Sequence, residues 1–224
     1  MDFEALWLTL RLAVGTTAIL LLVALPLAWW IASGHGAGRA FVQSIVALPL
    51  VLPPTVLGFY LLIAMGPLTA PGRLLMQLFG HPLAFSFGGL LIGSILYSLP
   101  FAVQPFAASF TSVDRKLIAA SATLGASPLR TFFQVVVPLS VPGLITGAAL
   151  TFAHTMGEFG VVLMVGGNIP GVTRTVSIDI FDRVQASDYA GANQTALLLL
   201  VLCFTVLTVV YGLNRRIWMV GPVK

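Results

Sequence analysis

Charged residues are scarce in this 224-residue chain. Asp, Glu, Lys and Arg make up 8% of it, while 58% is hydrophobic and the mean hydropathy is +1.01. A soluble domain carries roughly 25% charged residues, and a membrane-spanning helix needs about 20 apolar ones. Five charge-free runs meet that length: Leu12–His35, Ala40–Gly72, His81–Val113, Thr131–Gly157 and Tyr189–Asn214. The sequence therefore predicts an all-α integral membrane protein with about five transmembrane helices, not a soluble helical core.

The residues of metal and catalytic sites are equally sparse. Cys203 is the single cysteine, so the chain has neither a disulfide framework nor a thiolate metal site. The three histidines lie in different segments: His35, His81 and His154. Neither Lys116 nor Lys224 follows a glycine, which excludes a P-loop for ATP. We expect no catalytic residue, metal or cofactor in this chain, and any energy source must lie in another chain.

The sparse charges are distributed unevenly. With five crossings and residues 115–116 inside, the inner side has a net charge of +6 and the outer side −2. The inner charges are Arg39, Arg115, Lys116, Arg130, Arg215, Arg216 and Lys224 against Asp114. This distribution obeys the positive-inside rule, so we expect the N-terminus outside and the C-terminus inside. The overall charge of +4 then reflects membrane orientation and lipid contact, not nucleic-acid binding. Six crossings, with residues 138–167 split in two, would put Arg215 and Arg216 on the wrong side.

Three prolines interrupt the second apolar segment, about 40–65. They are Pro49, Pro53 and Pro54. Proline removes a backbone donor and clashes with the preceding turn, so this helix must be kinked or broken. Broken backbone at membrane depth is tolerated where protein or water covers it, as in many transporters. The pattern fits either a transport pathway or a merely kinked helix.

Small and hydroxylated residues recur at multiples of four positions in the third and fourth apolar segments. The stripes are Ser86, Ser94 and Ser98, and Gly143, Gly147, Thr151 and Thr155. Residues four apart share a helix face, and small residues let membrane helices pack closely. Packing is the simpler interpretation; the functional one is that hydroxyls line a hydrated pathway. Together with Glu158, a carboxylate near the membrane, the pathway or gate candidates are Ser94, Ser98, Thr151, Thr155 and Glu158.

Two polar loops complete the pattern. The outer loop, about 166–192, contains an amphipathic helix in which Ile178, Phe181 and Val184 recur at helical spacing. The inner loop, about 114–137, predicts a helical hairpin. Gly125 ends its first helix, and Ser127 and Pro128 start its second as N-cap and first helical residue. Its apolar residues could anchor it in a partner's groove or lie on the membrane: Leu124, Leu129, Phe132 and Phe133.

This hairpin resembles the cytoplasmic coupling motif of permeases in binding-protein-dependent ABC importers, Glu-Ala-Ala-x3-Gly-x9-Ile-x-Leu-Pro. Gly125 and Pro138 match at the required spacing, and Ala120 matches one alanine, but Ala119 replaces the glutamate and valines replace Ile and Leu. The resemblance implies an ATPase-coupling set of Ala119, Ala120, Ser121, Leu124, Gly125, Ala126, Ser127, Pro128, Arg130, Phe132 and Pro138.

Two further stretches are similar to molybdate permeases. One is LPLVLPPTVLGFYLL at 48–62; the other joins Gly-Glu-Phe-Gly at 157–160 to GNIPGVTRT at 167–175. Sulfate/thiosulfate permeases share much of this pattern and are the alternative. The resemblance implies the type I ABC importer permease fold as one domain, 1–224, in the cytoplasmic (inner) membrane of a prokaryote. It further implies a homodimer, cytoplasmic ATPase subunits and an external binding protein that carries molybdate or tungstate.

The apolar segments contain no lysine or arginine to balance an anion. A dianion in a dry pore without cations would lose its hydration at a cost of many kcal/mol. We therefore expect a hydrated cavity without a tight site, and selectivity in the binding protein. A passive channel or a secondary carrier usually has intramembrane charges or inverted repeats, and neither is evident here. A membrane scaffold is a third class, and a stable complex with a P-loop ATPase would separate it from an importer.

Overall fold

The computed structural model describes the backbone of residues 2–220 and their side chains, except those of 213 and 215–220. Within that range the chain is helical and has no strand. The elements are α1 (Phe3–Ala32), α2 (Ala37–Val51), α3 (Pro54–Met65), α4 (Ala70–Phe79), α5 (Phe87–Thr111), α6 (Arg115–Thr123), α7 (Pro128–Thr131), a π-helical turn (Phe132–Val136), α8 (Val137–Met156), α9 (Gly160–Gly166), α10 (Val176–Gln185) and α11 (Tyr189–Val220). The side chains of Arg215 and Arg216, and Lys224, which we assigned to the inner side, lie outside the described part.

The number of membrane spans agrees with the prediction of five. Four helical segments are long and apolar enough to cross alone: α1, α5, α7 continued into α8, and α11 up to Gly212. The pair α2 and α3, bent by 112°, is long and apolar enough when taken together to make the fifth. The six-crossing alternative is wrong, because α8 ends at Met156 and the separate α9 has seven residues, far too few to span.

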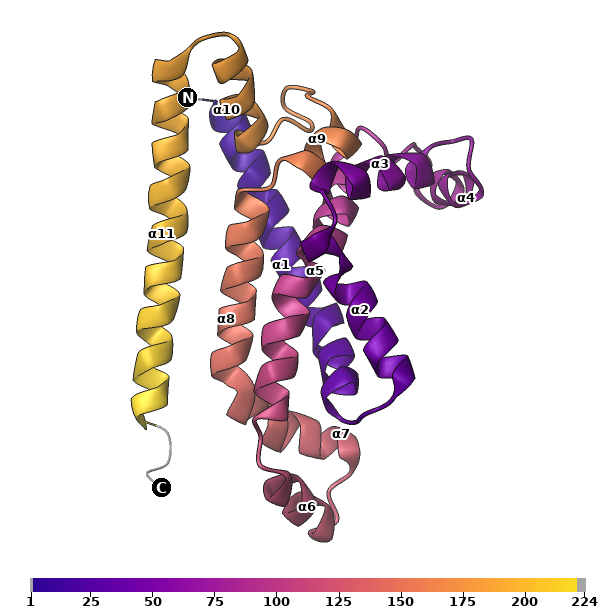
Figure 1. Ribbon diagram of the computed structural model, residues 1–224, viewed down its shortest axis with the longest axis vertical. Helices are drawn as coiled ribbons and strands as arrows, with labels where there is room; N and C mark the ends of the chain where they lie inside the picture. The colour runs from indigo at the N-terminus through magenta and orange to yellow at the C-terminus, as the bar shows by residue number, and fades with distance from the viewer. Residues whose placement is uncertain (1, 221–224) are drawn as a thin grey trace.

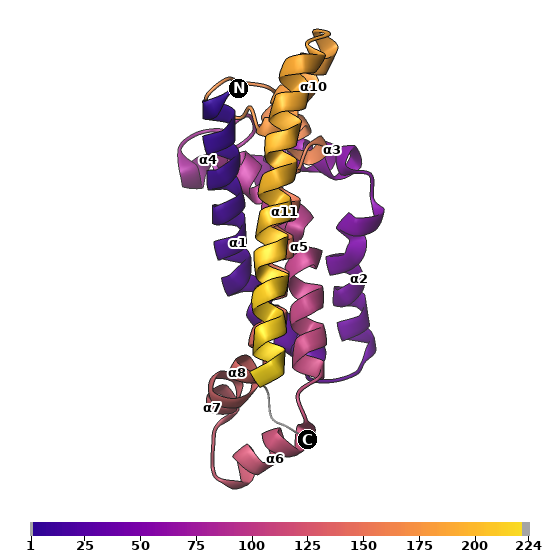
Figure 2. The same ribbon diagram turned by 90° about the vertical axis from the view of Figure 1, so that its left-hand side faces the viewer.

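The spans form one elongated bundle (Figure 1). Helices α1, α5 and α8 pack against one another in its middle, α2 lies against α5 and α1, and α11 lies against α8 and α10. The N-terminus lies at one end with α9 and α10, while α6, α7 and the C-terminal part of α11 lie at the other (Figures 1 and 2). This arrangement is what an odd number of crossings requires.

The break between α2 and α3 follows from adjacent prolines. A residue that precedes proline avoids the helical region, and Leu52 and Pro53 are accordingly extended, with ψ of 139° and 134°. Pro49 stays inside α2, whereas Pro54 begins α3. Of the two interpretations of this segment, the structure has the broken helix. Its second half packs on α9.

Small residues set the close helix contacts. Gly143 and Gly147 of α8 face α5. A Cβ atom at Gly147 would lie 2.6 Å from the Phe106 ring, and one at Gly143 would collide with the Ser109 side chain. Since both partners belong to α5, this half of the glycine and threonine stripe serves packing of α8 on α5. Phe106 is fully buried there, in the core of the inner half of the bundle.

Candidate functional site

The inner hairpin forms as its sequence predicts. The Asp114 carboxylate accepts a hydrogen bond from the Lys116 amide at the start of α6, and the Ser127 hydroxyl accepts one from the Arg130 amide at the start of α7. Gly125 between them has φ of 81°, in the left-handed region that favours glycine. The two helices are joined by a 2.9 Å hydrogen bond between the Ser121 and Thr131 hydroxyls.

Most of the proposed coupling residues lie on an open surface. No residue of α6 is buried, and Leu124 and Leu129 are 87% and 69% exposed. The exposed members of the set are Ala119, Ala120, Leu124, Gly125, Ser127, Pro128, Arg130 and Pro138, while Ser121 and Ala126 are half-buried. An unpartnered apolar surface on a short hairpin at the end of the bundle is suited to a groove in another protein.

Phe132 differs from the rest of the set. It is 8% exposed, and its ring lies 5.4 Å from Trp29 of α1 and 5.7 Å from Phe110 of α5. The expectation that Phe132 anchors in a partner's groove is therefore wrong for this subunit. Its neighbour Phe133, 59% exposed, keeps that position. Phe132 instead packs the start of the π-helical turn against two spanning helices.

The five pathway candidates lie together between α5 and α8. Ser94 donates a 2.6 Å hydrogen bond to Oε2 of Glu158, and the Ser98 hydroxyl lies 3.0 Å from that of Thr155. Thr151 donates to the carbonyl of Gly147 on its own helix. All five are buried, with exposures between 0% and 3%. The structure thus places the four hydroxyls in the contact between helices of one subunit, not on an accessible face.

Glu158 stands at the break between α8 and α9. Its Oε1 has no hydrogen-bond partner in the described part of the chain. Glu158 lines a pocket of about 570 Å³, which is also lined by Pro54 from the break between α2 and α3. The two helix breaks meet directly, since a Cβ at Gly160 would lie 2.7 Å from the Pro54 ring. Two interrupted helices therefore adjoin one pocket that holds Glu158 and His154 in a mainly apolar lining.

His154 was noted from the sequence, whereas its aromatic neighbours Tyr97 and Phe101 and two glutamines, Gln43 and Gln104, were missed. The His154 ring is stacked 3.9 Å from Phe101, lies 4.8 Å from Tyr97, and has its Nδ1 atom 2.9 Å from the Ser98 hydroxyl. A second pocket, of about 840 Å³, opens at the inner end between α2 and α5 and receives Gln43 and Gln104. The available signal was a carboxamide inside each of two otherwise apolar segments.

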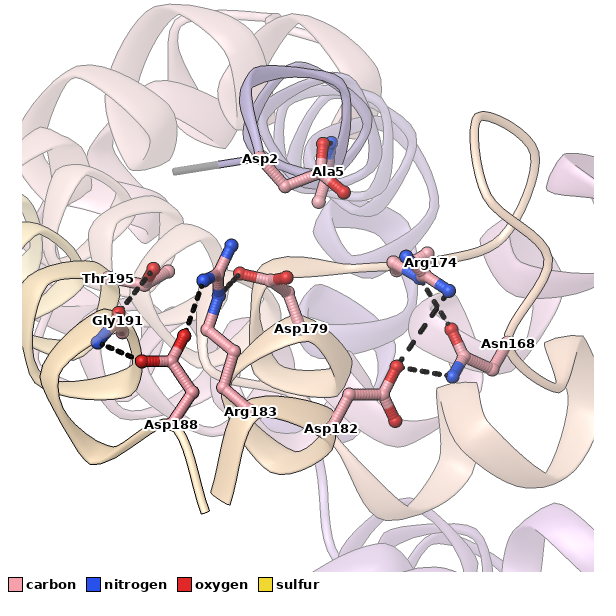
Figure 3. A network of polar contacts seen from close by, with 10 residues as sticks. All are labelled: Asp2, Ala5, Asn168, Arg174, Asp179, Asp182, Arg183, Asp188, Gly191 and Thr195. Atoms are coloured by element: carbon pink, nitrogen blue, oxygen red, sulfur yellow. Dashed lines mark hydrogen bonds and ion pairs between the residues drawn. The ribbon is translucent and has the colours of Figure 1, made fainter. Parts of the chain in front are cut away.

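The outer loop is tied together by charge pairs (Figure 3). Arg183 of α10 pairs with Asp179 at 2.9 Å and with Asp188 at 3.0 Å, and Arg174 donates to Asn168, which in turn donates to Asp182. Asp188 also accepts the Gly191 amide at the start of α11. That hydrogen bond and the Arg183 guanidinium hold the pKa of the Asp188 carboxyl below its ordinary value. The predicted amphipathic helix is present as α10. Of its three predicted apolar residues Ile178 is buried, as is Val176, whereas Phe181 and Val184 are exposed.

The chain is similar in sequence, over almost its whole length, to several named transport permeases. It is 50% identical over 214 residues to the "Molybdenum transport system permease protein ModB" of Azotobacter vinelandii, covering 96% of this chain and 95% of that one. The protein of the same name from Haemophilus influenzae is 37% identical, with 89% and 86% covered. A "Probable sulfate transport system permease protein cysT" from Zygnema circumcarinatum is 34% identical, with 93% and 71% covered.

The fold has a counterpart among solved structures. The MetNI methionine ABC transporter in an inward-facing conformation superimposes with a TM-score of 0.74 at 17% identity, over 96% of this chain and 95% of that one. The all-helical ABC importer permease fold predicted from the sequence is thereby confirmed. The family model described as "Binding-protein-dependent transport system inner membrane component" matches residues 24–219. The chain therefore belongs to the inner-membrane components of binding-protein-dependent transport systems, which are transport subunits and not enzymes.

Proposed function

We propose that this chain is the permease subunit through which an ATP-driven importer passes molybdate, or tungstate, across the cytoplasmic membrane. The observation that carries the proposal is the 50% identity, over 96% of the chain, to a relative named as a molybdenum transport permease. Sulfate or thiosulfate is the second candidate substrate, because a relative named for sulfate transport is 34% identical over 208 residues.

The proposed assembly has two copies of this chain, cytoplasmic ATPase subunits at the inner end and an external molybdate-binding protein at the outer end. Residues 1–224 form one permease domain, with the coupling loop at about 114–137 and the outer loop at about 166–192. The exposed hairpin, with Leu124, Leu129 and Phe133 outward, supports an ATPase contact. Phe132, packed on Trp29 and Phe110, supports transmission of ATPase movement into α1 and α5.

In this scheme ATP binding closes the ATPases and moves the two hairpins, and the bundle changes from inward-facing to outward-facing. The binding protein then releases its anion into the path between the subunits, and hydrolysis resets the cycle. Selectivity belongs to the binding protein, because the five charge-free runs of the sequence hold no lysine or arginine to balance an anion. A high-affinity molybdate site on the purified permease alone would contradict this division of roles.

The test is ATP-dependent uptake of labelled molybdate and sulfate, side by side, into vesicles that hold this chain with its cognate ATPase and binding protein. Molybdate uptake that excess tungstate blocks and sulfate does not is the expected result. Sulfate uptake instead would retain an oxyanion importer and change the substrate. A folded complex that imports neither anion would overturn the substrate class.

A further inference from the structure

Two glutamine side chains, Gln43 and Gln104, are exposed on spanning helices, at positions where contact with lipid would be unfavourable for a carboxamide. Gln43 is six residues into α2 and Gln104 is seven residues before the end of α5, so each lies about 10 Å from the inner end of its helix. Neither makes a hydrogen bond to any described residue of its own subunit. In lipid, a carboxamide would leave its donors and acceptor unpaired, which costs several kcal/mol.

The exposed hydroxyls of these spans behave differently. Ser44 of α2 donates to the carbonyl of Ala40, and Thr205 of α11 donates to that of Val201. A hydroxyl can thus satisfy itself on its own helix and remain in lipid, whereas the two carboxamides have not done so. Their exposure marks the face between α2 and α5 as one that meets water or a polar partner.

Both carboxamides enter the same pocket. The pocket of about 840 Å³ at the inner end is lined by Gln43, Gln104, Thr111, Ser112 and Arg115, among others. Arg115 is the first residue of α6, so the wall of the pocket includes the coupling hairpin itself. The described polar lining also includes His35; it offers several hydrogen-bond donors and one arginine and has no carboxylate, so it suits an anion better than a cation.

One stripe of α5 joins this pocket to the other. Tyr97, Phe101, Gln104, Ala108 and Thr111 follow at alternating spacings of four and three, which places them on one helix face. Tyr97 lines the outer pocket of about 570 Å³, and the last three line the inner one. Phe101, stacked on His154, stands between the two. A continuous face thus leads from the paired helix breaks to the coupling hairpin.

We propose that this α5 face is the subunit's share of the anion path, and that Gln43, Gln104 and Arg115 donate hydrogen bonds to a tetrahedral oxyanion or its water near the inner end. The proposal rests on the oxyanion import proposed above, with a second copy of the chain as the opposite wall. Neutral amide donors suit a path because an ion must be held weakly enough to leave. The buried Ser94, three residues before Tyr97 on the same side of α5, donates to Glu158 at the outer end of this face.

Thiol labelling tests whether this face is wet. In a Cys203→Ala background, the intact complex in vesicles carries Gln104→Cys, Leu200→Cys on the exposed side of α11, or Ser94→Cys in the helix contact. An anionic methanethiosulfonate should modify Gln104→Cys about tenfold faster than either control, since the thiolate forms in water and not in lipid or a packed core. Molybdate should slow that reaction. Equal rates at the three sites would overturn the proposal, as would protection by added anionic lipid but not by molybdate.

Uptake tests whether the face carries the anion. The Gln43→Leu/Gln104→Leu double variant should lower ATP-driven uptake by about tenfold, the loss of roughly one hydrogen bond to a charged group, while it still co-purifies with the ATPase. Gln194→Leu, which removes an exposed carboxamide at the outer end of α11, is the matched control with uptake unchanged. Full uptake by the double variant would overturn the proposed anion path. Absence of uptake by the wild type would overturn the proposed function instead. The thiol labelling would then still show whether the α5 face is in contact with water.

Discussion

Ser94 on α5 donates a 2.6 Å hydrogen bond to Oε2 of Glu158, 64 residues further along the chain, while Oε1 of the same carboxyl group has no partner among the described residues. This bond joins a spanning helix to the break between α8 and α9, beside the pocket where both interrupted helices meet. It is the polar contact that fixes the position of the Glu158 side chain.

Removing the Ser94 hydroxyl should destabilise the subunit. Ser94→Ala leaves the buried Glu158 carboxyl without a donor, at a cost of about 1 kcal/mol in the free energy of unfolding. Thr205→Val on α11 removes a hydroxyl that is exposed and bonded only to its own helix, and it should cost close to nothing. Unfolding of the purified protein by SDS in mixed micelles measures both. Equal losses for the two variants would contradict the role given to the Ser94 bond.

Truncation of the adjacent rings Phe132 and Phe133 should have different effects, one on stability and the other on ATPase binding. Phe132→Ala removes a buried ring packed on Trp29 and Phe110, and such truncations cost about 3–5 kcal/mol. Phe133→Ala, at a side chain 59% exposed, should leave stability within about 0.5 kcal/mol and weaken binding of the ATPase instead. Thermal melting of the subunit and co-purification of the ATPase separate the two effects. A stable Phe132→Ala variant would show that the ring is not part of the core.

These two rings also show where prediction from the sequence ends. The hairpin could be predicted because its signals are local: a cap at Asp114, another at Ser127, and a glycine that adopts a left-handed conformation at 125. Which phenylalanine faces the bundle depends on where Trp29 of α1 lies, and no local pattern records that. The motif match placed Phe132 in the coupling set, whereas in the structure its side chain belongs to the core.

For the interrupted helix and the pathway candidates, too, local signals could be predicted from the sequence and contacts between helices could not. Adjacent prolines predict a break after Val51, but the 112° turn that lays α3 on α9 depends on the close contact of Pro54 with Gly160. The four-residue spacing of serines and threonines identified one helix face correctly, and could not tell whether that face meets another helix or water. The contact between α5 and α8 decided it, with Ser94 and Ser98 fully buried.

A bulky substitution at Gly125 should uncouple the permease without unfolding it. The position has φ of 81° and open space around its missing Cβ, so Gly125→Trp strains the turn and covers the docking surface, and Gly125→Pro cannot adopt that φ at all. Both should abolish ATP-driven uptake and reduce ATPase co-purification, with membrane insertion intact. Gly212→Trp, at a helical glycine of α11 with equally open space, is the control. Normal uptake by Gly125→Trp would refute the docking role of the hairpin.

Acid should weaken the outer end of the bundle through Asp188. The Gly191 amide and the Arg183 guanidinium lower the pKa of this carboxyl from its ordinary 3.8, so its contribution to stability is complete above that pH and is lost as the pH falls through the lowered value. The difference in melting temperature between wild type and Asp188→Asn should therefore shrink as the pH falls below 3.8. In an Arg183→Gln background the difference should be smaller above pH 3.8, where Asp188 is ionised, because one of its two contacts is gone. A difference that stays constant with pH would mean that the ionised Asp188 does not stabilise the start of α11.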